Sequence, residues 1–478
     1  MPAREERAFA PIFLFGGGLY DVGEKKPVPP YSVIVYKDND KIRAEDAKGK
    51  RISWGRSPKD DKSVIQDAIN SLPDDGGKIV LREGTYYVES PIELRSDIVF
   101  ENQGVIKASS KDVMLVKGYN IKNFELRGGK YDGARSTYGG EQTSKFGLSF
   151  ENCENFRIVG IYVYDTTSSG LFIQYSNDFI VTQSRFELTG QPNVGYGDGI
   201  KVISSEKFTI SDCITYQTGH CCFDIATSYR FTLTGNVATY SRSRNGFTIN
   251  TCKWGVLVGN VAYQNAHDGV RLENSRRIIV ASNSISYNGR CGIKLYTIWD
   301  SADCVENVVY GNFISDNNKE GGTDYDGIRL GEELDSKKTG YNLVVGNYII
   351  RGSGERHKYG IRLRSDAQHN QIFRNHVVWG GELAPILDEG SNNVVRENIG
   401  FLTENSGVAT FSGDGSAKQF SIAHGLVSEP SKVQVTPMTE DAAGDFYVTK
   451  DSTNIYVNYL SAPPSGSDNV KLSWYAEV

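Results

Sequence analysis

Apolar and polar residues alternate with period two in short segments through the middle of the chain. In residues 268–272 and 326–330, apolar side chains occupy every second position and charged side chains lie between them. This alternation is typical of a β-strand with one buried face. Gly, Asn, Asp and Ser gather between such segments and indicate turns. The pattern therefore predicts many short strands joined by tight turns.

The strands recur at a regular interval. A glycine followed by an apolar, an outward and a second apolar residue begins at Gly147, Gly170, Gly199, Gly246, Gly269, Gly292, Gly327 and Gly360, with Cys222 in the glycine position between 199 and 246. The successive intervals are 23, 29, 23, 24, 23, 23, 35 and 33 residues. A chain keeps such a period when one supersecondary unit is stacked repeatedly.

A second series, of asparagines, follows the same interval. Its members are Asn236, Asn260, Asn283, Asn312, Asn347, Asn375 and Asn398. Val, Ile, Thr and Tyr dominate, and the helical half of a leucine-rich repeat is missing. We therefore predict an all-β right-handed parallel β-helix with these residues stacked inside it: Ile200, Phe223, Phe247, Val270, Ile293, Ile328 and Ile361.

Three regions are expected along the chain. Residues 1–61 contain prolines and a Lys/Asp-rich stretch, and are interpreted as a leader or attachment segment. Residues 62–405 are expected to form the β-helix. Its first coil would be capped by a short amphipathic helix over 63–70, because repeat folds need their ends covered. Residues 406–478 alternate small-residue turns with aromatic strands, and predict a small C-terminal β-sandwich.

The capping helix, the Asp-Asp-Gly-Gly turn at 74–77 and the Gly-Thr-Tyr strand at 84–86 resemble the entry to the pectate-lyase-like β-helix superfamily. That superfamily includes polysaccharide lyases, hydrolases, uronan C5-epimerases and phage tail spikes. The resemblance covers roughly residues 62–400. It implies the fold rather than one activity, because one fold hosts many chemistries. The last region resembles C-terminal modules of tail fibres, which implies glycan binding or trimerisation.

Composition narrows the possibilities. The seven cysteines contain no CxxC pair and are odd in number, so most are expected to be buried thiols. The net charge of -6 argues against a generally basic nucleic-acid binder, and no membrane span is expected. No signal peptide is recognised, since the apolar run at 8–15 is short and flanked by glycine. We therefore expect a virion-associated or extracellular protein, and a homotrimer if it is a spike.

The outward position two residues after each glycine carries mostly basic side chains. Along the stack it holds Phe172, Lys201, Asp224, Thr248, Arg271, Lys294, Arg329 and Arg362. Equivalent residues of neighbouring coils lie about 4.8 Å apart, so such charges repel unless they face acids or an anionic ligand. One interpretation is a solvated charged face. The other is a polysaccharide-binding face, with Lys294, Arg244, Arg329 and Arg362 binding carboxylates and Tyr296 stacking on sugar.

Asp224 interrupts this basic series and marks the predicted site. Lys201 and Arg271 are its basic neighbours along the stack and are expected to keep its carboxylate ionised. His220 and His267 occupy matching turn positions two coils apart. Asp224, His220, Lys201, Arg271 and His267 are therefore the candidate catalytic residues.

Residues 209–295 also resemble the catalytic modules of mannuronan C5-epimerases. Phe223 and Asp224 match the Phe-Asp of that family's motif, whereas Cys221 and Ala226 stand where its tyrosine and histidine would be. The resemblance therefore implies a related site without the family's own two proton-transfer groups.

Three functions stay open. A lyase needs cations for the uronate carboxylate, here Lys201, Arg271 and Lys294, and a base, here His220 or His267. A hydrolase needs two carboxyl groups, here Asp224 with Asp198 or Asp268, although both partners also fit turn capping. The third is a glycan-binding spike without enzymatic activity. Lyase action on an anionic polysaccharide is the leading hypothesis; no metal site or cofactor is assigned, and the acidic segment 321–326 leaves Ca²⁺ open.

Overall fold

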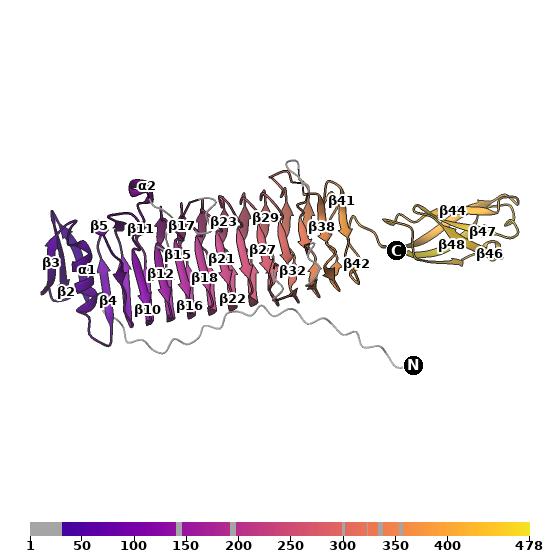
Figure 1. Ribbon diagram of the computed structural model, residues 1–478. Coiled ribbons are helices and arrows are strands. Elements are labelled where there is room, and N and C mark those ends of the chain that lie inside the picture. Colours follow the sequence, from indigo (N-terminus) through magenta and orange to yellow (C-terminus); the bar gives the residue numbers. More distant parts are fainter. Residues whose placement is uncertain are drawn as a thin grey trace, which may run out of the picture.

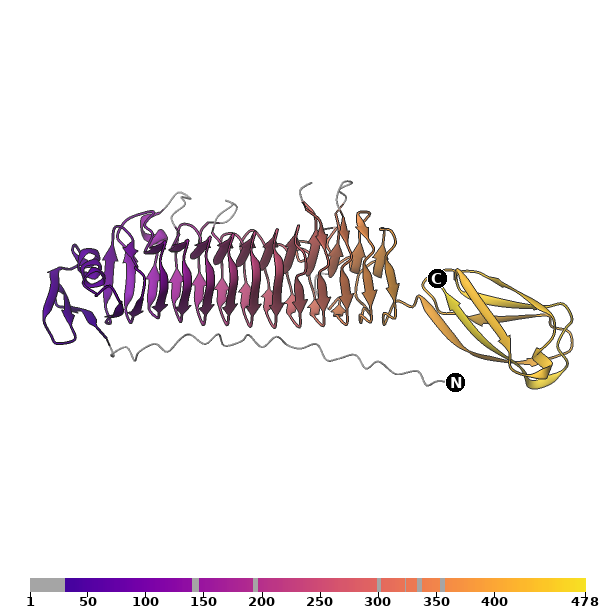
Figure 2. The same cartoon turned by 90° about the horizontal axis from the view of Figure 1, so that it is seen from below.

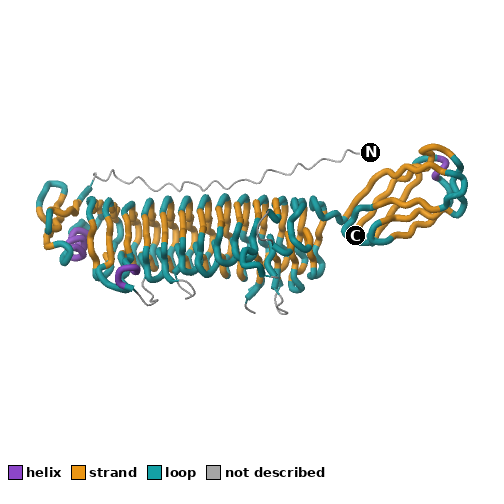
Figure 3. Tube along the Cα trace, turned by 90° about the horizontal axis from the view of Figure 1, so that it is seen from above, coloured by secondary structure: helices purple, strands orange, loops and turns teal. Residues whose placement is uncertain are grey.

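The computed structural model describes residues 31–478 apart from 140–145, 192–196, 299–301, 323, 333–337 and 353–356. The middle of the chain is a right-handed parallel β-helix, whose coils stack along one long axis (Figure 1). Most coils contribute one strand to each of three sheets, named here A, B and C. Viewed at right angles, the coils lie side by side along the axis with turns along the edges (Figures 2 and 3). The predicted fold class is confirmed.

Sheet A has 16 strands, of which 13 belong to coils. These are β4 (Gly77–Leu81), β7 (Ile98–Asn102), β10 (Lys122–Arg127), β13 (Glu154–Val159), β16 (Asn177–Thr182), β19 (Glu206–Ser211), β22 (Tyr229–Thr234), β25 (Lys253–Val258), β28 (Ile279–Ala281), β32 (Val308–Tyr310), β36 (Leu343–Val345), β40 (Gln371–Phe373) and β42 (Val394–Arg396).

Sheet B has 11 strands. They are β5 (Thr85–Val88), β8 (Val105–Ala108), β11 (Lys130–Asp132), β14 (Tyr162–Tyr164), β17 (Arg185–Glu187), β20 (Ile214–Tyr216), β23 (Val237–Thr239), β26 (Val261–Tyr263), β29 (Ser284–Ser286), β33 (Phe313–Ser315) and β37 (Tyr348–Ile350).

Sheet C has 12 strands and carries the glycine motif at its strand starts. They are β6 (Ile92–Glu93), β9 (Val116–Tyr119), β12 (Leu148–Glu151), β15 (Leu171–Gln174), β18 (Ile200–Ile203), β21 (Phe223–Ala226), β24 (Phe247–Asn250), β27 (Val270–Glu273), β30 (Ile293–Tyr296), β34 (Ile328–Leu330), β38 (Tyr359–Leu363) and β41 (Ala384–Asp388). The short strands β31 (Cys304–Val305), β35 (Thr339–Gly340) and β39 (Ala367–Gln368) form a small sheet beside them.

The repeated glycine has a steric cause. A Cβ atom at Gly199 would lie 2.6 Å from the carbonyl oxygen of Cys222, and one at Gly292 would lie 2.6 Å from that of Gly327. At this position the backbone of one coil passes directly against the carbonyl of the next, which favours glycine, and Cys222 is the exception within the series. Behind it, Ile200, Phe223 and the other predicted inward residues pair coil to coil and are fully or almost fully buried.

Buried asparagines tie the coils together at the turns. Each Asn of the predicted series except the last, Asn398, donates to the side-chain oxygen of its equivalent one coil on, as Asn260 does to Asn283 at 3.0 Å and Asn283 to Asn312 at 2.9 Å. The same oxygens accept the backbone N–H groups of the preceding coil, for example Asn260 N at 2.9 Å from Asn283. Two further ladders, which the sequence pattern did not single out, are Asn265–Asn288–Asn317 and Asn307–Asn342–Asn370–Asn393.

The first coil is capped as expected. Helix α1 (Asp61–Asn70) buries its apolar face, including Val64, Ile65 and Ile69, in the same core as the first coils. Before it, β1 (Val33–Asp38), β2 (Lys41–Asp46) and β3 (Arg51–Arg56) form an antiparallel meander, and β1 pairs with β4. Part of the expected leader segment therefore extends sheet A, and residues 1–30 lie outside the described residues. A short helix, α2 (Arg135–Tyr138), follows β11.

The C-terminal region has two small antiparallel sheets and its own core. One contains β43 (Glu404–Gly413), β48 (Gly466–Glu477) and β45 (Lys432–Pro437), and the other β44 (Gln419–Ala423), β47 (Asn454–Tyr459) and β46 (Phe446–Lys450). A 3₁₀ turn, η1 (Glu440–Ala442), packs against β48. This is the predicted β-sandwich, and it begins within β43, slightly before the expected boundary at residue 406.

All seven cysteines are buried free thiols. Within the described residues, no helix has the length and apolar character needed to cross a membrane.

We expect Asn283→Ala to destabilise the fold by roughly 3 kcal/mol, because it leaves the buried N–H of Asn260 and the carbonyl of Leu257 without partners. Urea unfolding measures the change. Asn70→Ala, at the exposed end of α1, is the control and should stay within about 0.5 kcal/mol. Equal effects would show that the ladder contributes nothing beyond an ordinary surface amide.

Candidate catalytic site on sheet C

The predicted outward residues form one column across sheet C. Register pairs Lys201 with Asp224, Asp224 with Thr248, Thr248 with Arg271, and Arg271 with Lys294. The column is nevertheless covered: Asp224 is 8% exposed and Arg329 only 1%. An open charged face, the simpler of the two interpretations, does not describe these buried side chains.

A repeated ion pair within single coils neutralises much of the basic column. In three coils an aspartate precedes the glycine and pairs with the base three residues on. The pairs are Asp198 with Lys201 at 3.3 Å, Asp268 with Arg271 at 2.6 Å and Asp326 with Arg329 at 2.8 Å. The other carboxylate oxygen of each aspartate accepts a backbone N–H of the next coil, from Cys221, Cys291 and Tyr359 respectively. These aspartates thus fix the turns, as predicted, and also carry the countercharge that the sequence pattern did not locate.

One of these three ion pairs is joined by a further acid from the next coil, and this group forms the candidate site. We call Asp198, Lys201, His220, Cys221 and Asp224 the Asp198 cluster. The Lys201 ammonium bridges two carboxylates, at 2.7 Å from Asp224 and 3.3 Å from Asp198. His220 Nδ1 lies 2.7 Å from Asp198 Oδ1, which also accepts the Cys221 N–H at 3.0 Å. Arg271, Arg329 and Arg362 also contact at least two acids each, but here one of the two acids, Asp224, stands in the outward column itself.

The two carboxyl groups have opposite pKa shifts. Burial by itself would raise the pKa of Asp198, but the charges of Lys201 and His220 and the hydrogen bonds from His220 and Cys221 lower it to about 2. Burial raises the pKa of Asp224, and the nearby Asp198 charge adds to this against the attraction of Lys201. Of the two basic neighbours, Lys201 does lower the pKa of Asp224, but burial and the charge of Asp198 outweigh it, and Arg271 pairs with other acids.

His220 carries a proton at neutral pH. Burial opposes the charged form, but Cys221 and Asp198 outweigh it and raise the pKa of His220 to about 11. An imidazolium donates its proton and accepts none, which argues against a role for His220 as a resting base.

The same group offers mixed donors for a metal ion. An oxygen of Asp198, a nitrogen of His220 and the sulfur of Cys221 lie within 4.8 Å of one another. Asp198 Oδ1 already accepts two hydrogen bonds, and the Lys201 ammonium on Oδ2 adds positive charge beside it. The donor set is compatible with a metal ion, but the neighbouring ammonium opposes one, and we assign none.

Arg271 and Tyr296 belong to a second, separate network. Arg271 bonds Asp268 and Glu273, the latter at 3.3 Å, and Tyr296 Oη donates to Glu273 at 2.7 Å. The Lys294 ammonium lies 4.4 Å from the centre of the Tyr296 ring, and Arg271 lies 5.4 Å from it. Because this ring is buried between two cations, it offers no face to a sugar, contrary to the prediction.

The remaining basic residues of the column are also paired. Lys294 bonds Glu332 at 2.6 Å, Arg329 bonds Asp324 and Asp326, and Arg362 bonds Asp324 and Glu389. Asp324, Glu332 and Glu389 come from turns and strand ends whose position the sequence pattern did not reveal. Of the predicted binding residues, Arg244 stands apart because it is exposed.

His267 does not join the Asp198 cluster. Burial, with the charge of Arg290, lowers its pKa to about 4, so the ring is neutral. Its Nε2 lies 3.8 Å from Glu320 Oε1. Within the described part of the chain it makes no hydrogen bond to Asp198, Lys201 or Asp224. The structure thus brings together Asp224, His220 and Lys201, and places Arg271 and His267 beside them in other networks.

Known proteins resemble the chain at the level of fold and, more weakly, of sequence. The family model of the periplasmic copper-binding protein NosD matches residues 130–354. Endopolygalacturonase B of Aspergillus oryzae is 26% identical over 267 residues, which is 51% of this chain and 67% of that protein.

Two solved structures share the fold. The A-module of a mannuronan C-5 epimerase from Azotobacter vinelandii has a TM-score of 0.58 at 20% identity, covering 72% of this chain and 95% of that one. A family 28 exopolygalacturonase from Yersinia enterocolitica has a TM-score of 0.56 at 13% identity, covering 74% and 82%. The chain is thus a right-handed parallel β-helix protein. These likenesses agree with the resemblance to the pectate-lyase-like superfamily that the sequence carries.

His220→Gln should change how stability depends on pH. Because the folded pKa of His220, about 11, exceeds its ordinary value of 6.5, its contribution is complete below pH 6.5 and is lost as pH rises toward 11. The difference in unfolding free energy between parent and variant should therefore shrink from pH 6 to pH 10. Urea titrations at both pH values measure it. Parallel pH profiles would mean that His220 is not held as an imidazolium by Asp198.

Proposed function

We propose that the protein is a glycoside hydrolase that cleaves a uronate-containing polysaccharide at the Asp198 cluster. The observation that carries the proposal is the pair of carboxyl groups with opposed pKa shifts, bridged by one lysine. Glycosidic hydrolysis uses such a pair: one carboxyl group that keeps its proton and one that is ionised.

Each residue receives a role from its surroundings. Asp224, with the raised pKa and some remaining exposure, protonates the glycosidic oxygen. Asp198 is the ionised carboxylate, and His220 covers its Oδ1. The His220 side chain is 18% exposed, so rotation of the imidazole on substrate entry frees that oxygen to activate water. Lys201 holds both acids in register and keeps Asp198 ionised.

Hydrolysis fits the site better than the lyase reaction that the sequence pattern favoured. A lyase needs a free cation for the uronate carboxylate and an unprotonated base. Lys201, Arg271 and Lys294 are all paired with protein carboxylates, and His220 is protonated. His267 is neutral, but it lies outside the Asp198 cluster and faces Glu320. The endopolygalacturonases among the relatives support the same choice, and the polygalacturonase and mannuronan epimerase names support a uronate substrate.

Incubation with polygalacturonate and with alginate separates the three functions. New reducing ends without absorbance near 235 nm are expected, because hydrolysis forms no double bond. Absorbance at that wavelength would instead establish a lyase. Retention on the polysaccharide with neither signal would establish a binding protein such as a spike.

Asp224→Asn should lower turnover by roughly 10² to 10⁴ while the fold is kept, because the amide cannot donate the required proton. Asp326→Asn is the matched control. Asp326 is also buried, next to strand β34 of sheet C, but among the described residues its carboxylate forms an ion pair only with Arg329 of its own coil. Thermal unfolding checks both variants. Similar small losses at the two positions would show that Asp224 is a structural acid.

Assembly and location stay predictions. The expected homotrimer is tested by sedimentation equilibrium of the whole chain. A glycan-binding or trimerising role for the C-terminal sandwich rests on the tail-fibre resemblance. The virion-associated or extracellular location rests on the interpretation of the sequence.

A further inference from the structure

A groove lies beside the candidate site, on the turns that lead from sheet B to sheet C. It has a volume of about 400 Å³, within the range of small-molecule sites. Its lining comes from four successive turns and from the segment after β33: Gln217, Tyr240, Ser241, Arg242, Gln264, Asn265, Ala266, Tyr287, Gly289, Lys319 and Glu320. We propose that this groove is a second binding site, which holds an extended uronate polysaccharide chain along the helix axis.

Tyrosines form a staggered row at the groove. Tyr216, Tyr240, Tyr263 and Tyr287 come from consecutive coils and contact edge to face, with ring centres 5.4, 6.3 and 5.6 Å apart. The row alternates between two positions, because Tyr216 and Tyr263 end their strands whereas Tyr240 and Tyr287 are the first turn residues. Only the second pair lines the groove, and these two are 40% and 37% exposed.

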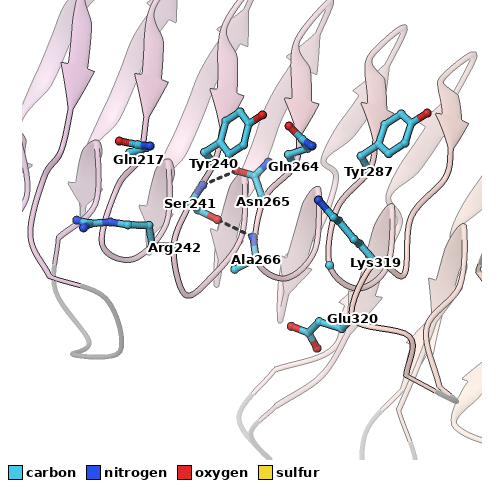
Figure 4. A pocket seen from close by; sticks show the side chains of 11 residues that line it. Gln217, Tyr240, Ser241, Arg242, Gln264, Asn265, Ala266, Tyr287, Lys319 and Glu320 are labelled. Atoms are coloured by element: carbon cyan, nitrogen blue, oxygen red, sulfur yellow. Dashed lines mark hydrogen bonds between the residues drawn. The ribbon is translucent and has the colours of Figure 1, made fainter. Parts of the chain in front are cut away.

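The spacing of this exposed pair suits a polysaccharide. Tyr240 and Tyr287 lie two coils apart, which is roughly 9.6 Å at the strand spacing of a β-sheet. An extended glycan presents the same face of its sugar rings at every second residue. Two aromatic rings on alternate coils therefore meet equivalent faces of one chain, and Figure 4 shows both rings on the same side with Gln264 between them.

Polar atoms between the rings lack partners within the protein. Gln264 Oε1 and Arg242 Nε are buried, and in the described part of the chain neither makes a hydrogen bond. A buried polar atom without a partner is costly, and sugar hydroxyl groups both donate and accept. Small movements of these two side chains would bring the unpaired acceptor and donor against such hydroxyls.

Charge at the groove favours an anionic chain. Arg242 Nη2 donates to the carbonyl of Gly190 at 2.7 Å, which anchors its guanidinium without a carboxylate. Lys319 is exposed, and among the described residues no acid pairs with it. The acid of the groove, Glu320, is occupied by Arg290 at 3.1 Å. Two cations without protein countercharges therefore face the groove, unlike the neutralised column of sheet C.

The groove and the Asp198 cluster share a turn: Gln217 lines the groove, and His220 follows three residues later. A chain held here would concentrate substrate beside the cluster. The class of ligand rests on the proposed function, but occupation of the groove requires no catalysis.

The test compares binding to polygalacturonate and alginate by affinity electrophoresis of the full chain. Tyr240→Ala/Tyr287→Ala should weaken binding about tenfold or more, because both stacking faces are lost. The matched control is Tyr310→Ala/Tyr341→Ala, which removes two exposed tyrosines from other positions and should change binding less than twofold. Tyr240→Trp/Tyr287→Trp keeps the faces and should retain parent affinity, which excludes a mere folding effect.

The outcomes separate this proposal from the hydrolase. Unchanged affinity in the alanine pair, equal losses in groove and control pairs, or no binding of either polysaccharide by the parent would overturn it. Binding without reducing ends would refute the hydrolase and leave the groove supported.

Discussion

The whole structure depends on the registered stacking of one coil on the next at the spacing of hydrogen-bonded strands. At the start of each sheet C strand, the backbone passes so close to the following coil that a Cβ at Gly246 would lie 2.7 Å from the carbonyl oxygen of Gly269. At the turns, each buried asparagine satisfies its own amide and the N–H of the coil before it. Both contacts require equivalent residues to be superposed, so register is fixed along the axis, and with it every outward column.

That register places basic side chains directly above one another, and it also places acids where they neutralise those bases. Superposed bases repel one another, yet the aspartate before the glycine reaches the base three residues later and, with its second oxygen, the next coil. Most bases of sheet C are thereby neutralised within the protein. The Asp198 cluster differs because an acid, Asp224, stands in the column itself and shares Lys201 with Asp198. The opposed pKa shifts of the two acids follow from burial, which raises the pKa of Asp224, and from the contacts of Asp198 with Lys201 and His220, which lower its pKa.

The turn between sheets B and C links the two proposed sites. The turn after β20 carries His220, which contacts Asp198, and Gln217, which lines the groove. Tyr240 lines the groove from the next turn, after β23. The cations of sheet C are paired with protein acids, whereas Arg242 and Lys319 are not paired with carboxylates among the described residues. The structure therefore places the buried, internally paired Asp198 cluster beside a partly exposed, cationic surface.

The sequence by itself determined the fold, because a period of 23 residues with glycine at a fixed place specifies stacking, and alternation specifies which side chains point inward. It also located Asp224, Lys201 and His220 on adjacent coils, since register converts spacing into neighbourhood. It could not determine which charges meet. Asp324, Glu332 and Glu389 lie outside the regular columns and reach the basic residues only through turn geometry. The state of Asp224 and the burial of Tyr296 were likewise decided by tertiary structure, because desolvation depends on what covers a side chain, and no repeat encodes that.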